Sequence, residues 1–89
     1  MARLTFTGHL RDIAPEAPAA FPGDTLGEVL QAAFGTAPRL RHYILDDQGR
    51  VRQHVIIFID DEHIPRETAL SVPITEHSDI YVLQALSGG

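Results

Sequence analysis

The chain has 89 residues and no cysteine, so it can build one domain with one modest core, and disulfides, cysteine-ligated metal sites and thiol nucleophiles are excluded. Its net charge is −5, with seven arginines scattered among twelve acidic residues, which argues against nucleic-acid binding and favours an electropositive protein partner. Neither an apolar stretch of the ~20 residues that a membrane span requires nor a secretory signal is visible, so we expect a cytoplasmic protein with no membrane partner.

Two strands are predicted at the start of the chain. Polar and apolar side chains alternate over residues 3–7, which is typical of a half-buried strand. A return strand over residues 17–21 would complete a hairpin. Pro15 and Pro18 lack the amide N–H that a sheet needs, so this second strand is expected at an edge.

One helix is predicted after the turn at Gly23-Asp24. Thr25 and Glu28 have the S/T-x-x-E spacing of a capping box, in which Thr25 accepts a hydrogen bond from the amide of Glu28 and Glu28 reaches back. Gly35 is placed to end the helix in the left-handed conformation, and Pro38 limits its continuation. The apolar residues that recur on one helical face are Leu26, Val29, Leu30, Ala33 and Phe34.

The second half of the chain predicts three more strands. Residues 42–45 form the first of them, and the β-branched apolar run over 54–59 indicates a central strand buried on both faces, or nearly so. Residues 60–63 are expected to form a turn. The irregularly spaced apolar residues of 64–74 predict a loop that covers an open edge of the core, and residues 80–86 predict the last strand.

This order of elements predicts an α+β fold in which one main helix packs across a mixed sheet of four to five strands. We expect a single domain over residues 1–86, followed by a flexible Ser-Gly-Gly tail over 87–89.

Several kinds of catalytic centre lack a sequence pattern here. The five histidines show no HExxH motif or H-x-x-x-H pair, the serines lack a G-x-S-x-G context, and no glycine-rich phosphate loop with a lysine exists. The acidic run Asp60-Asp61-Glu62 lacks the spacing of a calcium loop and is expected to be a solvated turn. We therefore expect a carrier or substrate of other enzymes that itself binds neither a metal nor a cofactor.

Gly88 and Gly89 are the candidate functional residues. Without side chains, they allow a thin backbone to enter a narrow cleft and present a terminal carboxylate there. The alternative is a frayed or artificial end with no function. A carboxylate is unreactive as an acyl group until its oxygen becomes a good leaving group, and adenylation by ATP achieves this. The activated acyl group can then pass to sulfur or to an amine.

The sequence resembles the MoaD/ThiS family of ubiquitin-like sulfur carriers, which have the β-grasp fold and a C-terminal Gly-Gly. The segments that carry the likeness are Phe6 with Leu10-Arg11-Asp12, residues 23–30, residues 55–61, residues 79–83 and Gly88-Gly89. Where small subunits of molybdopterin synthase commonly have two prolines, this chain has Gln84-Ala85. The resemblance covers essentially the whole chain and leaves the pathway open.

By that resemblance, a ubiquitin-activating-type adenylyltransferase uses ATP to adenylate Gly89, a sulfur donor protein converts it to a thiocarboxylate, and a sulfur-accepting synthase receives the sulfur. Molybdopterin, thiamine, cysteine or a related product are the candidate pathways. The alternative is a protein modifier that forms isopeptide bonds through Gly89 with target lysines. This chain has no lysine, so such a modifier could not form lysine-linked chains with itself. A plain β-grasp interaction domain is the third hypothesis.

Side chains alternate along the last predicted strand, so one set points toward the helix and the other away from it. If the set with Ile80 and Val82 faces the helix, Tyr81 and Leu83 form an exposed apolar patch that a partner could contact. The alternative is that a second layer of loop covers them. The tail itself spans ~10 Å when extended. The predicted partner-binding residues are Tyr81, Leu83, Ala85, Leu86 and Ser87.

Overall fold

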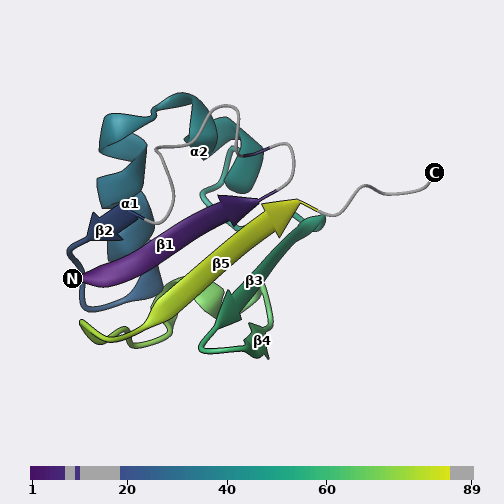
Figure 1. Ribbon diagram of the computed structural model, residues 1–89. Helices are drawn as coiled ribbons and strands as arrows, with labels where there is room; N and C mark the ends of the chain where they lie inside the picture. The colour runs from purple at the N-terminus through teal and green to yellow at the C-terminus, as the bar shows by residue number, and fades with distance from the viewer. Residues whose placement is uncertain (8–9, 11–18, 85–89) are drawn as a thin grey trace.

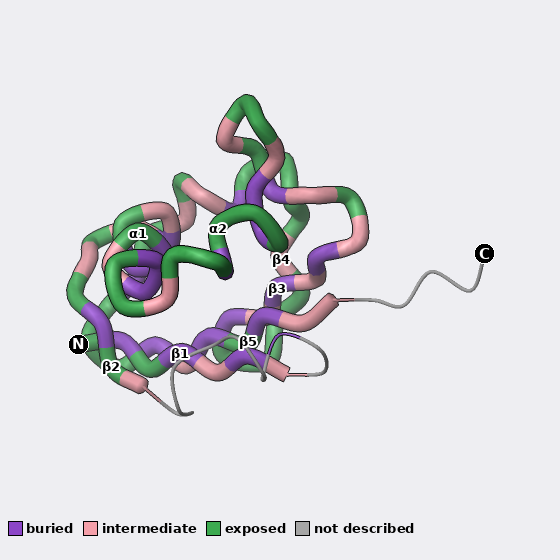
Figure 2. The backbone as a smooth tube through the Cα atoms, turned by 90° about the horizontal axis from the view of Figure 1, so that it is seen from above, coloured by how far each residue is buried: buried purple, intermediate pink, exposed green. Residues whose placement is uncertain are grey.

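Five strands form one mixed sheet, and two α-helices lie over one of its faces (Figures 1 and 2). The computed structural model describes residues 1–7, 10 and 19–84. The elements in chain order are β1 (Ala2–Thr7), β2 (Ala19–Phe21), α1 (Leu26–Thr36), α2 (Arg39–Ile44), β3 (Val55–Ile59), β4 (Glu62–Ile64), the short 3-10 helix η2 (Ala69–Ser71) and β5 (Asp79–Gln84).

The strand order is β2-β1-β5-β3-β4, so the last strand of the chain lies at the centre of the sheet. β5 runs parallel to β1 and antiparallel to β3, while β2 and β4 form the two edges. The predicted α+β fold, with one main helix across a mixed sheet, is confirmed. The predicted return strand is present over residues 19–21 as β2 and lies at an edge, while Pro15 and residues 17–18 lie outside the described residues.

The core lies between the sheet and α1. The buried members of the strands alternate with exposed neighbours, and all five residues of the predicted helical stripe are buried. Each large aliphatic or aromatic side chain in this layer contributes about 1.5–3 kcal/mol through removal from water. The side chains that the sheet sends into the core are Leu4 and Phe6 of β1, Val55, Ile57 and Ile59 of β3, and Ile80 and Val82 of β5.

The predicted capping box opens α1. The Thr25 hydroxyl accepts a hydrogen bond from the Glu28 amide at 3.3 Å, and the Glu28 carboxylate reaches back to accept one from the Asp24 amide, also at 3.3 Å. The first bond satisfies an amide that the first turn leaves without a helical partner, and the second satisfies the amide just before the N-cap residue Thr25.

The prediction that Gly35 ends α1 in the left-handed conformation was wrong. Gly35 lies inside the helix, which ends at Thr36, and it does not adopt a positive φ. Ala37 precedes Pro38, which disfavours the helical conformation, and Ala37 adopts φ −142°. The Thr36 hydroxyl and the Ala37 amide both donate hydrogen bonds to the Ala33 carbonyl, so the last turn closes without a left-handed residue.

The strand predicted over residues 42–45 was also wrong, because most of this segment belongs to α2. Leu40 and Ile44 are spaced four residues apart and are both fully buried, so together they form the apolar side of a short helix. Only Leu45 is extended, and it forms an isolated bridge with Val51. A helix places side chains four residues apart on one face, so it can bury both Leu40 and Ile44 in the core.

β3 is fully buried on one face. Its burial alternates, with Ile56 and Phe58 partly exposed between buried neighbours, so the prediction of a strand buried on both faces, or nearly so, holds fully for one face and in part for the other. The turn predicted over 60–63 is shorter than expected. Asp60 and Asp61 make it with φ values of 51° and 69°, which Asp tolerates better than most residues. The chain then returns as β4, a strand that the sequence did not predict.

The segment after β4 packs across the start of α1, as the predicted covering loop required. Ala69 of η2 is fully buried, the amide of Leu26 donates to the carbonyl of Val72 at 3.0 Å, and that of Ile74 donates to the carbonyl of Asp24 at 2.9 Å. Among the residues that the structure describes, no helix is both long and apolar enough to cross a membrane.

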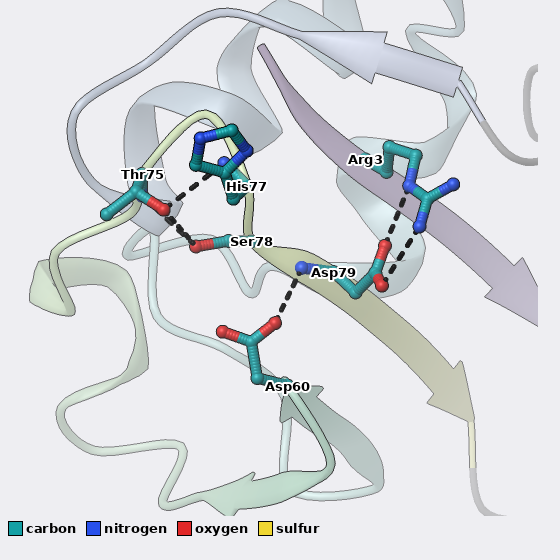
Figure 3. A network of polar contacts seen from close by, with 6 residues as sticks. All are labelled: Arg3, Asp60, Thr75, His77, Ser78 and Asp79. Carbon is teal, nitrogen blue, oxygen red and sulfur yellow. Dashed lines mark hydrogen bonds and ion pairs between the residues drawn. The ribbon is translucent and has the colours of Figure 1, made fainter.

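Polar contacts fasten the start of β5 to its neighbours (Figure 3). The Arg3 guanidinium donates two hydrogen bonds to the Asp79 carboxylate, at 2.9 and 3.1 Å, and the resulting stabilisation raises the pKa of Arg3 above its usual value. The Asp79 amide donates to the Asp60 carboxylate at 3.0 Å. The Ser78 hydroxyl accepts from the Thr75 amide in the preceding turn. These bonds hold the register of β1, β3 and β5 at this end of the sheet.

Candidate functional site

The central strand β5 leads directly toward the predicted diglycine. Gln84 is its last residue and lies opposite Val55, the first residue of β3. Sheet neighbours therefore hold both sides of the strand from which the chain continues toward Gly89 (Figure 1). Five predicted site residues lie outside the described residues: Ala85, Leu86, Ser87, Gly88 and Gly89.

Tyr81 and Leu83 lie on the sheet face that points away from α1. Ile80 and Val82, which alternate with them, are 1% and 0% exposed and belong to the core. Tyr81 is 41% exposed and Leu83 is partly exposed, so no second layer formed by residues 1–7, 10 and 19–84 covers Tyr81. The structure thus brings together the two described members of the predicted partner-binding set, and their contact with a partner stays a prediction.

Two further residues of this face come from β3 and were missed from the sequence. Ile56 lies opposite Leu83, and Phe58 lies opposite Tyr81. Phe58, Asp61, Tyr81 and Leu83 line an open hollow of about 330 Å³. The four apolar side chains Ile56, Phe58, Tyr81 and Leu83 are here called the outer apolar patch. Because strands alternate, every second residue of the unbroken run over 55–59 had to face outward unless both faces were covered, and this signal could have revealed them.

A neighbouring histidine extends this face toward the edge of the sheet. The Phe58 ring meets the His63 ring edge to face, with centroids 5.7 Å apart and planes at 65°. Such aromatic pairs favour this geometry because a positive ring edge meets a negative ring face. The pair restrains the Phe58 side chain at the border of the outer apolar patch.

The first residue of the acidic run after β3, Asp60, bonds to the start of β5. The Asp60 carboxylate accepts the Asp79 amide, and the Asp60 amide donates to the Asp79 carbonyl at 2.9 Å. Within the described part of the chain, no group of three His, Asp or Glu side chains is arranged to hold a metal ion.

The sequence matches the family model of the ThiS family over residues 4–89. The chain belongs to the ThiS family. The match includes the diglycine, so ThiS-family membership covers the end of the chain as well as the folded domain. As a ThiS-family protein, it is a ubiquitin-like sulfur carrier or modifier, and proteins of this family are small carrier proteins. No curated protein matches the sequence.

Solved structures with the same fold come from several organisms. SAMP1 from Haloferax volcanii has a TM-score of 0.79 and 21% identity over 99% of this chain and 98% of that one. CysO from Mycobacterium tuberculosis has a TM-score of 0.83 and 20% identity over 97% and 100%. The BexX/CysO complex from Amycolatopsis orientalis contains a chain with a TM-score of 0.85 and 13% identity over 100% of both. At these identities the likeness establishes the ubiquitin-like β-grasp fold of this ThiS-family chain.

Proposed function

We propose that this chain carries sulfur as a thiocarboxylate on Gly89. The observation that carries the proposal is the ThiS family match, which extends through Gly88 and Gly89. The sheet topology supports it, because β5, the strand that precedes the last five residues, lies at the centre of the sheet. A rigid sheet with a side-chain-free end suits a group that another enzyme must reach in a narrow site.

The proposed chemistry has two activation steps. The Gly89 carboxylate attacks the α-phosphorus of ATP in a ubiquitin-activating-type adenylyltransferase, forms an acyl adenylate and releases pyrophosphate. A hydrosulfide equivalent from a sulfur donor protein then attacks the acyl carbon, AMP leaves, and the thiocarboxylate remains. A sulfur-accepting synthase takes the sulfur in a later step. In this scheme ATP is bound by the partner, and the chain contributes the acyl group and a docking surface rather than catalysis.

The outer apolar patch is the proposed contact surface for these partners. It borders the strand that leads to Gly89, and aromatic and aliphatic residues of this kind are the ones that dominate binding energy at interfaces. The solved BexX/CysO complex, whose chain shares this fold, supports the view that such domains bind a second protein.

Replacing both Tyr81 and Leu83 by alanine is expected to weaken binding of the adenylyltransferase by about 10- to 100-fold, because each is an apolar anchor at an interface centre. Isothermal titration calorimetry against the adenylyltransferase measures this. Tyr43→Ala is the matched control, since Tyr43 lies on α2 and is 42% exposed, against 41% for Tyr81. Equal affinities for the double variant and the wild type would contradict a docking role for the patch.

Intact-mass analysis of protein purified from its native host tests the proposal directly. A species in which one oxygen of the chain is replaced by sulfur, with the change located to Gly89 by fragmentation, is the expected result. Protein that remains a plain carboxylate after incubation with ATP, the adenylyltransferase and a sulfur donor would refute it.

A protein modifier is the second candidate function. A structural relative of this chain is named small archaeal modifier protein 1, from Methanosarcina acetivorans. In this case Gly89 would form an isopeptide bond with a lysine of a target, and covalent adducts would appear in the same mass analysis. Because this protein has no lysine, each modified target lysine would carry one copy of it rather than a lysine-linked polymer.

A further inference from the structure

A second open hollow, of about 440 Å³, is lined by Asp46, Arg50, Arg52, Gln53, His54 and Arg66. Three arginines and one carboxylate line it, and the Glu67 carboxylate lies 3.4 Å from the Arg66 Nε. These three arginines and two carboxylates together leave a surplus of one positive charge. The hollow is here called the arginine hollow. A net charge of −5 for the whole chain gives no sign of it.

The arginine hollow lies at the end of the sheet from which the chain continues to Gly89. Arg52, Gln53 and His54 lead directly into Val55, and Val55 pairs with Gln84. The five residues after Gln84 span at most about 18 Å. A protein that holds Gly89 in its active site therefore comes close enough to contact the arginine hollow.

The opposite end of the sheet is acidic. The turn after β3, the start of β5 and the start of α1 meet there, as the bonds between Asp60 and Asp79 and between Ile74 and Asp24 show. Arg3 is paired with Asp79 at this end. The carboxylates that gather there are Asp24, Glu28, Asp60, Asp61, Glu62, Glu76 and Asp79. The carboxylates thus gather where β5 begins, while the three arginines of the arginine hollow lie at the end of the sheet nearest Gly89.

Two of the three guanidinium groups are anchored by the backbone. The Arg52 Nε donates to the His42 carbonyl at 2.8 Å, and an Arg66 Nη donates to the Val51 carbonyl at 3.1 Å. Arginine has five N–H donors, so one bond to a carbonyl leaves others for carboxylates, and the Arg66 Nε already lies 3.4 Å from the Glu67 carboxylate. A guanidinium that is already oriented loses less conformational entropy on binding, and its planar fork matches a carboxylate with two parallel bonds.

The third arginine lies beside a carboxylate whose own bonds are mostly local. Asp46 accepts hydrogen bonds from the amides of Arg50 and Gln48, both at 2.9 Å, and the Arg50 bond above all lowers its pKa below the usual value. Its other oxygen is 3.5 Å from the Arg50 Nε. The Arg50 side chain is 70% exposed. Asp46 therefore shapes the turn and leaves the Arg50 guanidinium accessible to a second carboxylate.

We propose that the arginine hollow docks a carboxylate-rich surface of the protein that receives the Gly89 end. This inference rests on the proposed function and adds the chemistry of the partner at that contact. The outer apolar patch supplies apolar contact, and the arginine hollow supplies orientation and a faster encounter through electrostatic attraction. The net charge alone had favoured an electropositive partner. At this end of the domain, the local charge requires an acidic one.

A peptide titration tests the docking chemistry without any enzyme. A six-residue glutamate peptide added to the ¹⁵N-labelled full chain is expected to shift the amide signals of Arg50, Arg52, His54 and Arg66, and a glutamine peptide of the same length should not. The shifts should disappear in about 0.5 M NaCl, where the screening length falls to a few ångströms. Equal shifts from inorganic phosphate at the same concentration would overturn the proposal in favour of a small-anion site.

Adenylation kinetics separate this inference from the proposed function. Arg50→Gln combined with Arg52→Gln is expected to raise the KM for the carrier about tenfold at low salt with little change in kcat, and the difference should shrink at high salt. Arg3→Gln removes the same kind of charge at the far end and is the control. The double variant with Arg50→Lys and Arg52→Lys keeps both positive charges, so it should restore the salt-dependent part of the KM for the carrier.

The outcomes distinguish the two ideas. Wild-type protein that is never adenylated refutes the proposed function. Wild-type protein that is adenylated, together with a glutamine double variant of unchanged KM and native amide spectrum, refutes the arginine hollow as a docking site.

Discussion

Deletion of Gly89 is expected to reduce adenylation of the chain to about 1% of the wild-type rate or less, while leaving the fold intact. The deletion withdraws the terminal carboxylate by one residue, or ~3.3 Å in an extended backbone. A misplacement of about 1 Å at a reacting centre can already cost about 100-fold. ATP–pyrophosphate exchange, catalysed by the adenylyltransferase with the chain as acyl substrate, measures the effect.

The stability of the deletion variant provides the first control. Gly89 has no side chain that could pack in a core, so the urea midpoint should match that of the wild type. Gln31→Ala, an exposed change on α1, is the second control and should leave the exchange rate unchanged. Exchange that survives the deletion at the wild-type rate would show that Gly89 is not the activated residue.

Replacement of Gly23 by alanine is expected to lower the free energy of unfolding by about 3 kcal/mol or more. Gly23 has φ +151°, and a Cβ there would lie 2.7 Å from the Val29 amide nitrogen and 2.9 Å from the Glu28 Cβ. The amide nitrogen belongs to the first turn of α1 and cannot move aside cheaply. A domain of this size is stable by only about 5–13 kcal/mol, so the loss is a large fraction of the total.

Gly35→Ala is the matched comparison for this prediction. Gly35 lies inside α1, and no atom lies within 4 Å of an added Cβ. Alanine there should raise the free energy of unfolding by roughly 0.5–1 kcal/mol, since it is the better helix former. Urea unfolding of both variants measures the two effects, which have opposite signs. A Gly23→Ala protein as stable as the wild type would contradict the tight turn that the structure places before α1.

Local patterns predicted the elements whose stabilising contacts are close in sequence. The capping box of Thr25 and Glu28 and the apolar stripe of α1 are formed by residues within three or four positions of each other, so their geometry could be deduced without the rest of the chain. β1 was equally clear from its alternation. The diglycine was visible for the same reason, because its chemistry depends on having no side chains rather than on any distant contact.

The elements that were mispredicted depend on distant partners. Residues 42–45 contain β-branched and aromatic residues that suit a strand. Residues 42–44 are nevertheless helical, because the helix buries Leu40 and Ile44 against the core. β4 is three residues long and is defined by pairing with β3, which no local pattern reveals. Ile56 and Phe58 were assigned to the interior because composition cannot tell which faces of a sheet are covered.

By itself, the sequence determined the family of this protein. The ThiS family model matches residues 4–89, and the acyl group predicted at Gly89 follows from that resemblance without any knowledge of the fold. Only the tertiary structure decided what surrounds the strand that leads to that group. Pairing of Val55 with Gln84 places the arginine hollow beside it, and pairing of Phe58 with Tyr81 builds the outer apolar patch. Strand pairing joins residues more than twenty positions apart, so neither surface is visible in the order of the amino acids.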